Sequence, residues 1–455
     1  MKLEGKKVLV VGLGKTGEAL CQFLINRKAS VKISEKKSLE ELEINPSSLA
    51  ELGVAIEAGG HNPLSFLESD LIIPSPGVPM LPEMEAAKAN GIPILSEIEL
   101  AFRFIKGQIV GITGTNGKST TASLTHKILK DSGADVYLAG NIGTPLISFA
   151  NASQDSHVYV TELSSFQLEH ISLFHAAVAV FLNFSPDHLD WHRTYENYYA
   201  AKKKLIVSQR NGETAVLNRD DPSVWVLAET ARSQILAFSR TEDIKRGCLF
   251  RGDWIFLKDK KEEKLMKASD IPLLGTHNQE NVMASALVGL LFSVPLSRIR
   301  KSISDFPGLE HRLEKVLILD GIEYYNDSKA TNVDATIKSI RSFGRDILLI
   351  LGGRDKGGDF NKLRKPIQER VKKVFLIGEA RERIRKALEG TAPLAEVSSL
   401  KEAVRESFSS AAPGDVVLLA PACTSFDMFR NFEERGKIFK REVHSLKDKI
   451  RNAQR

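Results

Sequence analysis

A glycine-rich loop that ends in lysine and serine is the strongest chemical signal in the sequence. The loop reads TGTNGKST over residues 113–120, after an apolar run and before a stretch of helical composition. Backbone N–H groups of such a loop can wrap phosphate oxygens, while Lys118 reaches the β- and γ-phosphates and the Ser119 hydroxyl binds Mg²⁺. The spacing departs from the strict phosphate-loop pattern, because Ile112 stands where the first glycine belongs. The residues predicted to bind ATP here are Gly114, Thr115, Asn116, Gly117, Lys118, Ser119 and Thr120.

A second glycine pattern, G-x-G-x-x-G at Gly12, Gly14 and Gly17, lies between a predicted strand and a predicted helix. These glycines allow a tight turn and a close approach of the backbone to a phosphate. Glu35 ends the next predicted strand, where an acidic ribose ligand would lie. The pattern alone leaves NAD binding and a turn without ligand both open. Because the chain also carries an ATP loop, a nucleotide-linked substrate is the simpler interpretation.

Composition and charge exclude several classes of protein. Hydrophobic residues make up 42% and charged residues 26%, which excludes disordered, collagen-like and coiled-coil chains. Lysine and arginine exceed aspartate and glutamate by 6, an excess that suits anionic small substrates and is too weak to indicate nucleic acid. No apolar run approaches the ~18 residues of a membrane span, and the N-terminus leaves no room for a signal peptide. We therefore expect a cytoplasmic protein.

The three cysteines, Cys21, Cys248 and Cys423, are far apart in the sequence. Their spacing predicts neither a disulfide framework nor a zinc site.

The length of 455 residues predicts about three domains at roughly 150 residues each. Short apolar runs alternate with helical stretches, which indicates α/β units with mostly parallel sheets. We place the domains at residues 1–100, 101–305 and 306–455, because DFPGLEHRLE (305–314) contains the turn residues Pro307 and Gly308. The strands expected in the first domain are 6–14, 30–35, 70–78 and 93–96.

The other two domains show the same alternation. In the second, we expect strands at 108–113, 158–165, 177–184, 214–218 and 234–239, an antiparallel hairpin set over 248–266 and a helix over 277–292. In the third, we expect strands at 322–328, 346–353, 373–378 and 415–421. The charged tail 440–455 is interpreted as a solvated helix rather than a binding arm.

Eight motifs are spread in order along nearly the whole chain: TGTNGKSTT (113–121), GNIGTP (140–145), ELSSFQLE (162–169), NFSPDHLDWH (183–192), HNQEN (277–281), HRLE (311–314), NDSKATN (326–332) and GGRDKGGDF (352–360). Together they resemble the Mur ligases, the ATP-dependent amino-acid-adding enzymes of peptidoglycan synthesis. The resemblance implies an N-terminal Rossmann-like domain for a UDP sugar, a central ATPase domain and a C-terminal Rossmann-like domain for the amino acid. SPGV (75–78), ELSSFQLE and PACTSFDMFRNFEERG (421–436) are similar to the branch that adds D-glutamate to UDP-N-acetylmuramoyl-L-alanine. A monomer that binds neither nucleic acid nor membrane is expected.

The implied reaction activates a carboxylate with ATP, because oxide is too poor a leaving group for direct amide formation. The resulting acyl phosphate is attacked by the amine of D-glutamate, and the protein contributes positioning and charge neutralisation. By the resemblance, Lys118 stabilises the transferred phosphoryl group. Two Mg²⁺ ions are expected, with Ser119, Glu162 and His188 among their ligands.

Lys202 has a special expected role. It ends YYAAK (198–202), and related ligases carry a carbamylated lysine after Y-x-A-A. A carbamate offers a carboxylate-like oxygen, the type of ligand that Mg²⁺ prefers. The modification needs a neutral amine, which burial or a nearby positive charge favours. Because Lys203 and Lys204 follow directly, spacing alone also permits a register shift or a solvated basic run.

The remaining site residues follow from the resemblance. Asn278 and Asn281 would contact adenine, although helix capping by Asn278 is an alternative. ATP ribose and phosphate contacts are expected from Arg312, Asp327 and Lys329. D-glutamate contacts are expected from Thr331, Lys356, Ser425 and Phe432. UDP-substrate contacts are expected from Lys15, Thr16, Glu35 or Lys36, Gly77 and Asn141.

Three other classes of protein are considered. A folylpolyglutamate-type ligase shares the phosphate loop but lacks the N-terminal glycine-loop domain. An NAD-dependent dehydrogenase would leave Lys118 unexplained. A nucleotide-binding regulatory protein would not need Glu162, His188, Lys202 and Lys356 together.

Overall fold

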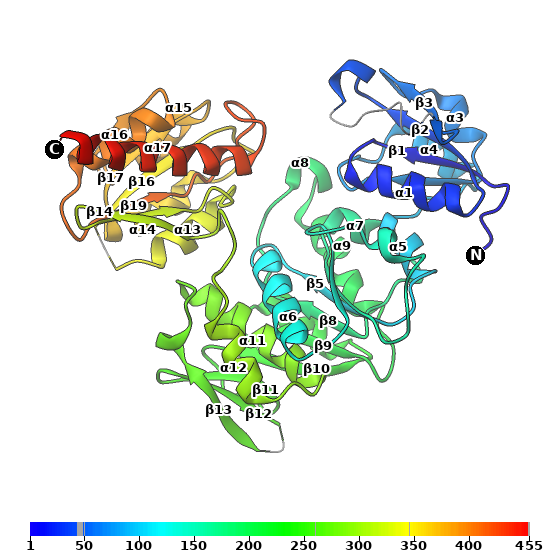
Figure 1. The fold of residues 1–455 in the computed structure, drawn as a ribbon, viewed down its shortest axis with the longest axis horizontal. Helices are drawn as coiled ribbons and strands as arrows, with labels where there is room; N and C mark the ends of the chain where they lie inside the picture. Colours follow the sequence, from blue (N-terminus) through cyan, green and yellow to red (C-terminus); the bar gives the residue numbers. More distant parts are fainter. Residues whose placement is uncertain (43–48, 50, 260, 345, 454–455) are drawn as a thin grey trace. The chain divides into compact units, whose positions relative to one another are not determined.

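The computed structural model describes residues 1–42, 49, 51–259, 261–344 and 346–453. The chain divides into two compact units. Their helices and strands are labelled in Figure 1. Unit 1 comprises residues 1–184, 194–267 and 280–303, and unit 2 comprises residues 185–193, 268–279 and 304–455. The described residues build three sheets, two in unit 1 and one in unit 2. The architecture is therefore α/β as expected, whereas the domain boundaries at residues 100 and 305 stay predictions.

The N-terminal sheet is parallel and has the order β3-β2-β1-β4. Its strands are β1 (Lys7–Val11), β2 (Ser30–Glu35), β3 (Ala55–Ala58) and β4 (Leu71–Pro74), and its helices are α1 (Lys15–Asn26), α3 (Pro63–Leu67) and α4 (Pro82–Ala89). The α1 helix buries Leu20, Phe23 and Leu24. The strand expected at residues 93–96 is wrong, because only a single bridge between Ile94 and Ile72 forms there.

The central sheet has the order β13-β12-β11-β10-β9-β8-β5-β7-β6. Its strands are β5 (Gln108–Thr113), β6 (Val136–Gly140), β7 (Val158–Glu162), β8 (Val178–Phe181), β9 (Thr214–Asn218), β10 (Gln234–Ser239), β11 (Gly247–Arg251), β12 (Trp254–Lys258) and β13 (Glu262–Lys267). The strands β5 to β10 pair in parallel, and β11 to β13 form antiparallel hairpins. The expected hairpin set is therefore confirmed.

Helices border the central sheet or connect its strands. They are α5 (Glu97–Phe102), α6 (Lys118–Asp131), α7 (Ser165–Glu169), α8 (Leu189–His192), α9 (Tyr195–Val207), α10 (Pro222–Trp225), α11 (Thr276–Leu291) and α12 (Leu296–Ser304). Short 3₁₀ turns occur at η1 (Leu39–Glu41), η2 (Leu146–Phe149), η3 (Val226–Glu229), η4 (Ala268–Asp270) and η5 (Phe360–Leu363). The α6 helix directly follows the phosphate loop, and it buries Leu124, Ile128 and Leu129.

The C-terminal sheet has the order β14-β15-β19-β16-β17-β18. Its strands are β14 (Glu314–Leu319), β15 (Ile322–Asn326), β16 (Ile347–Gly352), β17 (Val371–Ile377), β18 (Leu394–Glu396) and β19 (Val416–Leu419), and only β14 runs antiparallel to its neighbour. Its helices are α13 (Val333–Arg341), α14 (Arg364–Arg370), α15 (Arg381–Leu388), α16 (Leu400–Ser410) and α17 (Phe432–Ala453). The tail was expected to be solvated, but α17 begins earlier and buries Phe439 and Val443 in the core.

The three cysteines are free thiols inside the fold. Burial raises the pKa of Cys21 and Cys423 to about 12 and raises that of Cys248 well above its usual value. The prediction that they form no disulfide is consistent with these separate positions. Across the described part of the chain, no helix combines the length and apolar character needed to cross a membrane.

Candidate functional site

The phosphate loop connects the end of β5 to the start of α6, which is the strand–loop–helix context predicted for it. Gly114 has a φ of 152° and Gly117 a φ of 88°, conformations that favour glycine. A Cβ atom at Gly117 would lie 2.3 Å from Oδ1 of Asn281. The loop therefore needs glycine at position 117 for both its backbone and its packing.

Asn183 braces this loop, a role that the sequence did not reveal. Its carbonyl oxygen accepts from the Thr115 N–H at 2.9 Å, its Oδ1 accepts from the Asn116 N–H at 2.9 Å, and its Nδ2 donates to the Asn116 carbonyl at 3.0 Å. Asn183 lies just after β8, which pairs with β5. Only its place at the start of NFSPDHLDWH, near the end of the buried strand predicted over 177–184, could have drawn attention to it.

Lys118 and Lys202 converge on the phosphate loop. Lys118 Nζ donates to the carbonyl oxygens of Gly114 and Thr115, at 2.9 Å each. Lys202 Nζ donates to the Gly114 carbonyl at 2.8 Å, from a side chain that is 1% exposed. Lys203, the next residue of α9, is only half-buried. Of these two neighbouring lysines, Lys202 is the one whose amine reaches the loop.

Glu162 ends β7 and is almost fully buried. Its Oε1 accepts from Nδ2 of Asn141 at 2.9 Å, and its carbonyl oxygen accepts from the Asn141 N–H at 2.9 Å. Asn141 was predicted to contact the UDP substrate, and in the structure it holds the Glu162 carboxylate. A buried carboxylate at the end of a central strand is a suitable oxygen ligand for Mg²⁺.

These residues fit the phosphates of ATP and a divalent cation. The α6 N-terminus directs its backbone N–H groups and its dipole toward the loop. Ser119, in the first turn of α6, is 1% exposed. Lys118 supplies positive charge and Glu162 a carboxylate, both within unit 1.

The two asparagines of HNQEN have different surroundings. Asn281 Oδ1 accepts from the Thr121 hydroxyl at 3.2 Å, which ties α11 to α6. Asn278 Nδ2 donates to the Leu274 carbonyl at 2.7 Å. Because α11 begins at Thr276, Asn278 lies inside the first turn and not at the N-cap position, so the capping alternative for Asn278 is wrong.

The N-terminal glycine loop packs against the SPGV segment. The Ser75 hydroxyl donates to the Gly12 carbonyl at 2.8 Å. A Cβ atom at Gly12 would lie 2.7 Å from Val78, and one at Gly17 would lie 2.5 Å from the Gly12 carbonyl oxygen. Lys15 and Thr16 form the first turn of α1, and Gly77 lies in the packed segment. Four of the candidate UDP contacts, including Glu35, thus surround one turn.

Glu35 has a structural role in this turn. Its Oε2 accepts from the Leu13 N–H at 2.6 Å and its Oε1 accepts from the Lys37 N–H at 2.9 Å. One carboxylate oxygen therefore holds the glycine loop and the other holds the chain that follows β2, where Lys36 is exposed. A contact between Glu35 and a ligand stays a prediction.

A groove of about 820 Å³ opens beside the ends of β2 and β3. It is lined by residues 38–40 and 56–62. At its edge, His61 Nδ1 lies 2.8 Å from the Ser34 hydroxyl. No chemical signal in the sequence indicates this groove, because its glycines and short polar residues resemble an ordinary turn.

Unit 2 contains a cavity of about 300 Å³ that gathers three predicted site residues. His188, Thr331 and Lys356 line it together with Asp187 and Asp334. His188 has a φ of 52°, a left-handed conformation that is uncommon for histidine. Residues 185–189 line one side of this cavity. Asp187 holds them there through its contacts with Asn332 and Lys356.

Asp187 is the hub of the cavity. Asn332 Nδ2 donates to its Oδ2 at 2.8 Å, and Lys356 Nζ lies 3.7 Å from its Oδ1. Burial opposes ionisation, but the charges of Lys356 and His188 and the hydrogen bonds lower the pKa of Asp187 below its usual value. Asp187 belongs to the motif NFSPDHLDWH (183–192), but the sequence alone predicts no role for it.

The predicted ATP contacts of unit 2 lie just before β14 and just after β15. Asp327 is buried and accepts from the Ser339 hydroxyl, and burial raises its pKa although the Arg312 charge opposes this. Lys329 Nζ lies 4.9 Å from the centre of the Phe432 ring. Arg312, Asp327, Lys329 and Phe432 thus belong to one neighbourhood.

Arg435 organises the loop that carries Ser425, a role that the sequence alone does not predict. Its guanidinium is 2% exposed. It donates to the Ser328 hydroxyl at 2.9 Å, the Ser328 carbonyl at 2.8 Å and the Cys423 and Thr424 carbonyls at 3.2 Å. The hydroxyl of Ser425 is buried without a hydrogen-bond partner among the described residues, as expected for a group that awaits a ligand.

The four predicted metal ligands fall in both units. Ser119, Glu162 and Lys202 belong to unit 1, and His188 belongs to unit 2. Their common role in metal binding stays a prediction.

Three family models match the chain. They are a Mur ligase MurD-like N-terminal domain at residues 6–96, a Mur ligase middle domain at residues 112–289 and a Mur ligase glutamate ligase domain at residues 311–423. The chain belongs to the Mur ligase family. The dehydrogenase interpretation of the first glycine loop is therefore set aside.

Relatives of nearly equal length specify the branch that the chain resembles. A protein of Koribacter versatilis named UDP-N-acetylmuramoylalanine--D-glutamate ligase is 45% identical over 98% of this chain and 99% of its own length. One of the same name from Acidobacterium capsulatum is 47% identical over 97% and 96%. Among solved structures, a pseudomurein peptide ligase type C from Methanothermus fervidus (TM-score 0.61, 20% identity, 97% and 100% covered) shares the fold. So does UDP-N-acetylmuramate-alanine ligase MurC from Thermotoga maritima (TM-score 0.60, 18% identity, 97% and 100% covered).

Proposed function

We propose that this protein is an ATP-dependent ligase that adds D-glutamate to UDP-N-acetylmuramoyl-L-alanine during synthesis of peptidoglycan precursors. The observation that carries the proposal is identity of 45% and 47%, over nearly the whole chain, to relatives named for this reaction. The phosphate loop with Lys118 at the α6 N-terminus supports the use of ATP.

The chemistry proceeds in two steps. The terminal carboxylate of the alanyl group attacks the γ-phosphorus of ATP, and ADP leaves. The amine of D-glutamate then attacks the acyl phosphate, so that the C–N bond forms and inorganic phosphate departs. The protein lowers both barriers by holding the reacting groups together and by neutralising phosphate charge.

In the first step, backbone N–H groups of residues 114–120 cradle the phosphates, and the Lys118 ammonium moves from the loop carbonyls to the transferred group. Mg²⁺, when bound, neutralises negative charge on the phosphates. Ser119 and Glu162 would hold one ion, and His188 with a carbamate on Lys202 would hold a second.

Burial of Lys202 and its nearness to Lys118 support the carbamate. Both amines donate to one carbonyl oxygen, so two positive charges would lie close together in a poorly solvated place. This arrangement favours the neutral form of one amine, which is the form that reacts with CO₂. The carbamate would exchange a positive charge for a negative one beside the cation site.

For D-glutamate, the cavity with Thr331 and Lys356 offers a hydroxyl and an ammonium to a carboxylate. Ser425 and Phe432 would complete the pocket, with Arg435 holding their loop. Lys356 is shared with Asp187, so a substrate carboxylate would compete for the same ammonium.

For the other ligands, Lys15, Thr16, Gly77 and Glu35 or Lys36 would bind the UDP moiety around the first glycine turn, with Asn141 nearer the reaction centre. Arg312 and Lys329 would contact ATP phosphates, Asp327 its ribose, and Asn278 and Asn281 its adenine. We assign residues 1–100 to the UDP substrate, 101–305 to ATP and 306–455 to the amino acid, and expect a monomer.

Phosphate release from ATP tests the proposal. The purified protein is incubated with UDP-N-acetylmuramoyl-L-alanine and a panel of amino acids, each tested alone. We expect release only when the acceptor and D-glutamate are present together. Release with L-glutamate but not D-glutamate, or release that needs no acceptor, would contradict the assignment.

A further inference from the structure

A lysine of the last helix binds the loop that carries Arg312. Lys440 Nζ lies 2.5 Å from Oε1 of Glu310 and 2.8 Å from Oε1 of Glu314. The two glutamates lie two residues before and two residues after Arg312. One ammonium on α17 therefore clamps both ends of the loop.

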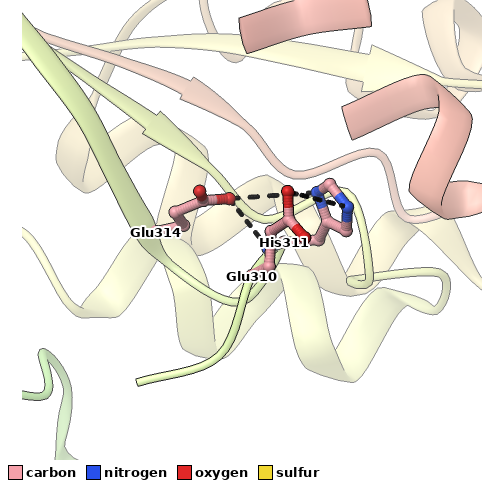
Figure 2. A group of neighbouring side chains, drawn as sticks. All are labelled: Glu310, His311 and Glu314. Carbon is pink, nitrogen blue, oxygen red and sulfur yellow. Dashed lines mark hydrogen bonds and ion pairs between the residues drawn. The ribbon is translucent and has the colours of Figure 1, made fainter. Parts of the chain in front are cut away.

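The second oxygen of Glu314 closes the loop from inside. Its Oε2 accepts from the His311 N–H at 2.9 Å and from Asn326 Nδ2 at 3.0 Å. Figure 2 shows Glu310, His311 and Glu314 facing one another. With both carboxylate oxygens engaged, Glu314 connects α17 to the loop and to β15.

The backbone of this loop needs such support. His311 has a φ of 64° and Leu313 a φ of 43°, left-handed conformations that cost about 1 kcal/mol or more each for residues other than glycine. Arg312 lies between them. Its backbone direction therefore depends on two unfavourable conformations that surrounding contacts must maintain.

The same loop touches a second predicted ATP contact. The His311 carbonyl accepts from the Lys329 N–H at 3.2 Å. On the other side, Gly436 of α17 packs so closely that a Cβ atom there would lie 2.2 Å from His311 Nδ1. The α17 helix thus holds His311, which lies next to Arg312 and binds Lys329, by packing as well as by charge.

The cluster also resembles a metal site, because single ligand atoms of Glu310, His311 and Glu314 lie within 4.8 Å of one another. However, the Lys440 ammonium already bridges the two carboxylates. Burial opposes its charge, but hydrogen bonds to both glutamates raise the pKa of Lys440 above its usual value. The ammonium is therefore the cation of this cluster.

We propose that Lys440, acting through Glu310 and Glu314, is a positioning residue that fixes the left-handed loop and so aims Arg312 at the ATP phosphates. Lys440 itself contacts no substrate. The inference rests on the proposed function, because it assigns Arg312 to ATP.

The test compares steady-state kinetics of Lys440→Met, Lys440→Arg and the control Lys447→Met. Lys447 lies on the same helix two turns further along and makes no ion pair with a described residue. We expect Lys440→Met to lower kcat/KM for ATP about tenfold and to leave KM for the UDP acceptor within about twofold. Lys440→Arg, which keeps the ion pairs, should retain most activity, and Lys447→Met should equal the wild type.

The decisive comparison places Lys440→Met in an Arg312→Ala background. Because Lys440 acts through Arg312, the second substitution should add little further loss. A fully additive loss, or full activity of Lys440→Met alone, would overturn the proposal.

Amide hydrogen exchange separates this inference from the proposed function. Exchange of residues 309–316 should accelerate in Lys440→Met while the rest of unit 2 keeps its protection. If the wild type shows no ATP-dependent ligation, the proposed function fails, and unchanged exchange at 309–316 would then reject the clamp as well. Loss of protection throughout unit 2 would show a general folding defect and would also reject a specific clamp.

Discussion

Lys118 and Lys202 donate to the same carbonyl oxygen, that of Gly114, at 2.9 and 2.8 Å. One lysine comes from the start of α6 and the other from the middle of α9. Bound phosphate would draw the Lys118 ammonium away from this shared acceptor, and carbamylation would convert the Lys202 amine into a carbamate. The phosphate loop is thus held by the two side chains that the proposed chemistry needs.

Chemical rescue tests the role of Lys202. Lys202→Ala should lose most activity, because no carbamate oxygen can then form. Acetate in solution can occupy the vacated space and should restore part of the rate. Saturation should need millimolar or higher concentrations, because untethered acetate loses translational and rotational entropy when it binds. The rate is measured against acetate concentration.

Two controls make this test specific. Lys203→Ala should change stability by about 0.5 kcal/mol or less and keep its activity, because this lysine is half-buried and away from the loop. Chloride at matched ionic strength screens charge equally but is a poor Mg²⁺ ligand. Equal rescue by chloride, or inactivity of Lys203→Ala instead, would show that Lys202 is not the carbamylated residue.

Glu162 is expected to act by its charge and not only by its shape. Glu162→Gln keeps an oxygen that can accept from Asn141, but removes the negative charge that a cation needs. Turnover should therefore fall by more than about a hundredfold in both Glu162→Gln and Glu162→Ala, with UDP-substrate affinity nearly intact. Steady-state rates and acceptor binding are measured, and an active Glu162→Gln would leave only a structural role. Wild-type activity that persists in excess chelator would reject metal dependence.

Gly117 is expected to tolerate no side chain. In Gly117→Ala, the new Cβ atom would meet Asn281 Oδ1 at 2.3 Å, and the φ of 88° would be strained. Gly133 has a similar φ of 93° with nothing within 4 Å, so Gly133→Ala pays only the conformational cost, about 1 kcal/mol. ATP affinity, measured by calorimetry, should drop at least about tenfold in Gly117→Ala and remain unchanged in Gly133→Ala. Equal affinities in the two variants would mean that the close approach to Asn281 is unimportant.

Glu97 should give stability a dependence on pH near neutrality. Its carboxylate is 1% exposed and accepts from the Ile147 N–H at 2.6 Å. Burial raises the pKa of Glu97 from 4.5 to about 7, although hydrogen bonds from Ile147 and Leu146 oppose this. Because the folded protein holds the proton more tightly, this stabilisation is complete below pH ~4.5 and is lost as the pH rises to about 7. The loss is about 3 kcal/mol at most.

Thermal unfolding of Glu97→Gln measures this effect. The Tm of the variant relative to the wild type should increase between pH 5 and pH 8, since glutamine does not titrate. Glu85→Gln, on the exposed face of α4, should show a constant difference. A constant difference for Glu97→Gln as well would contradict a neutral carboxyl at this site.

The sequence predicted those features that are determined by residues close together in the chain. The phosphate loop and the β11–β13 hairpins combine turn residues with strand or helix periodicity in one short segment, so neighbours in sequence determine them. By contrast, β14 and β18 were missed, because their partly exposed patterns resemble loops until a neighbouring strand is present. The four residues PILS are too few to distinguish a strand from an extended connection.

Long-range contacts explain the rest. Asn183 braces the phosphate loop only because β8 lies beside β5 in the sheet, and strand order cannot be inferred from one segment. The burial of α17 depends on a few apolar residues such as Phe439, which lie among many charged residues. The charged composition of the segment therefore does not reveal its buried face. The roles of Arg435 and Asp187 could not be predicted for the same reason, because the partners of each residue come from distant parts of the chain.

The burial of every thiol has a practical consequence for spectroscopy. The thiolate is the form of cysteine that attacks a thiol reagent, and burial keeps Cys21, Cys248 and Cys423 both inaccessible and protonated. A cysteine introduced at an exposed position such as Lys437 would therefore be the reactive one in an otherwise native chain. Two such cysteines could then be labelled with maleimide dyes while all natural cysteines stay in place. Fluorescence energy transfer would report the distance between the two dyes during the catalytic cycle.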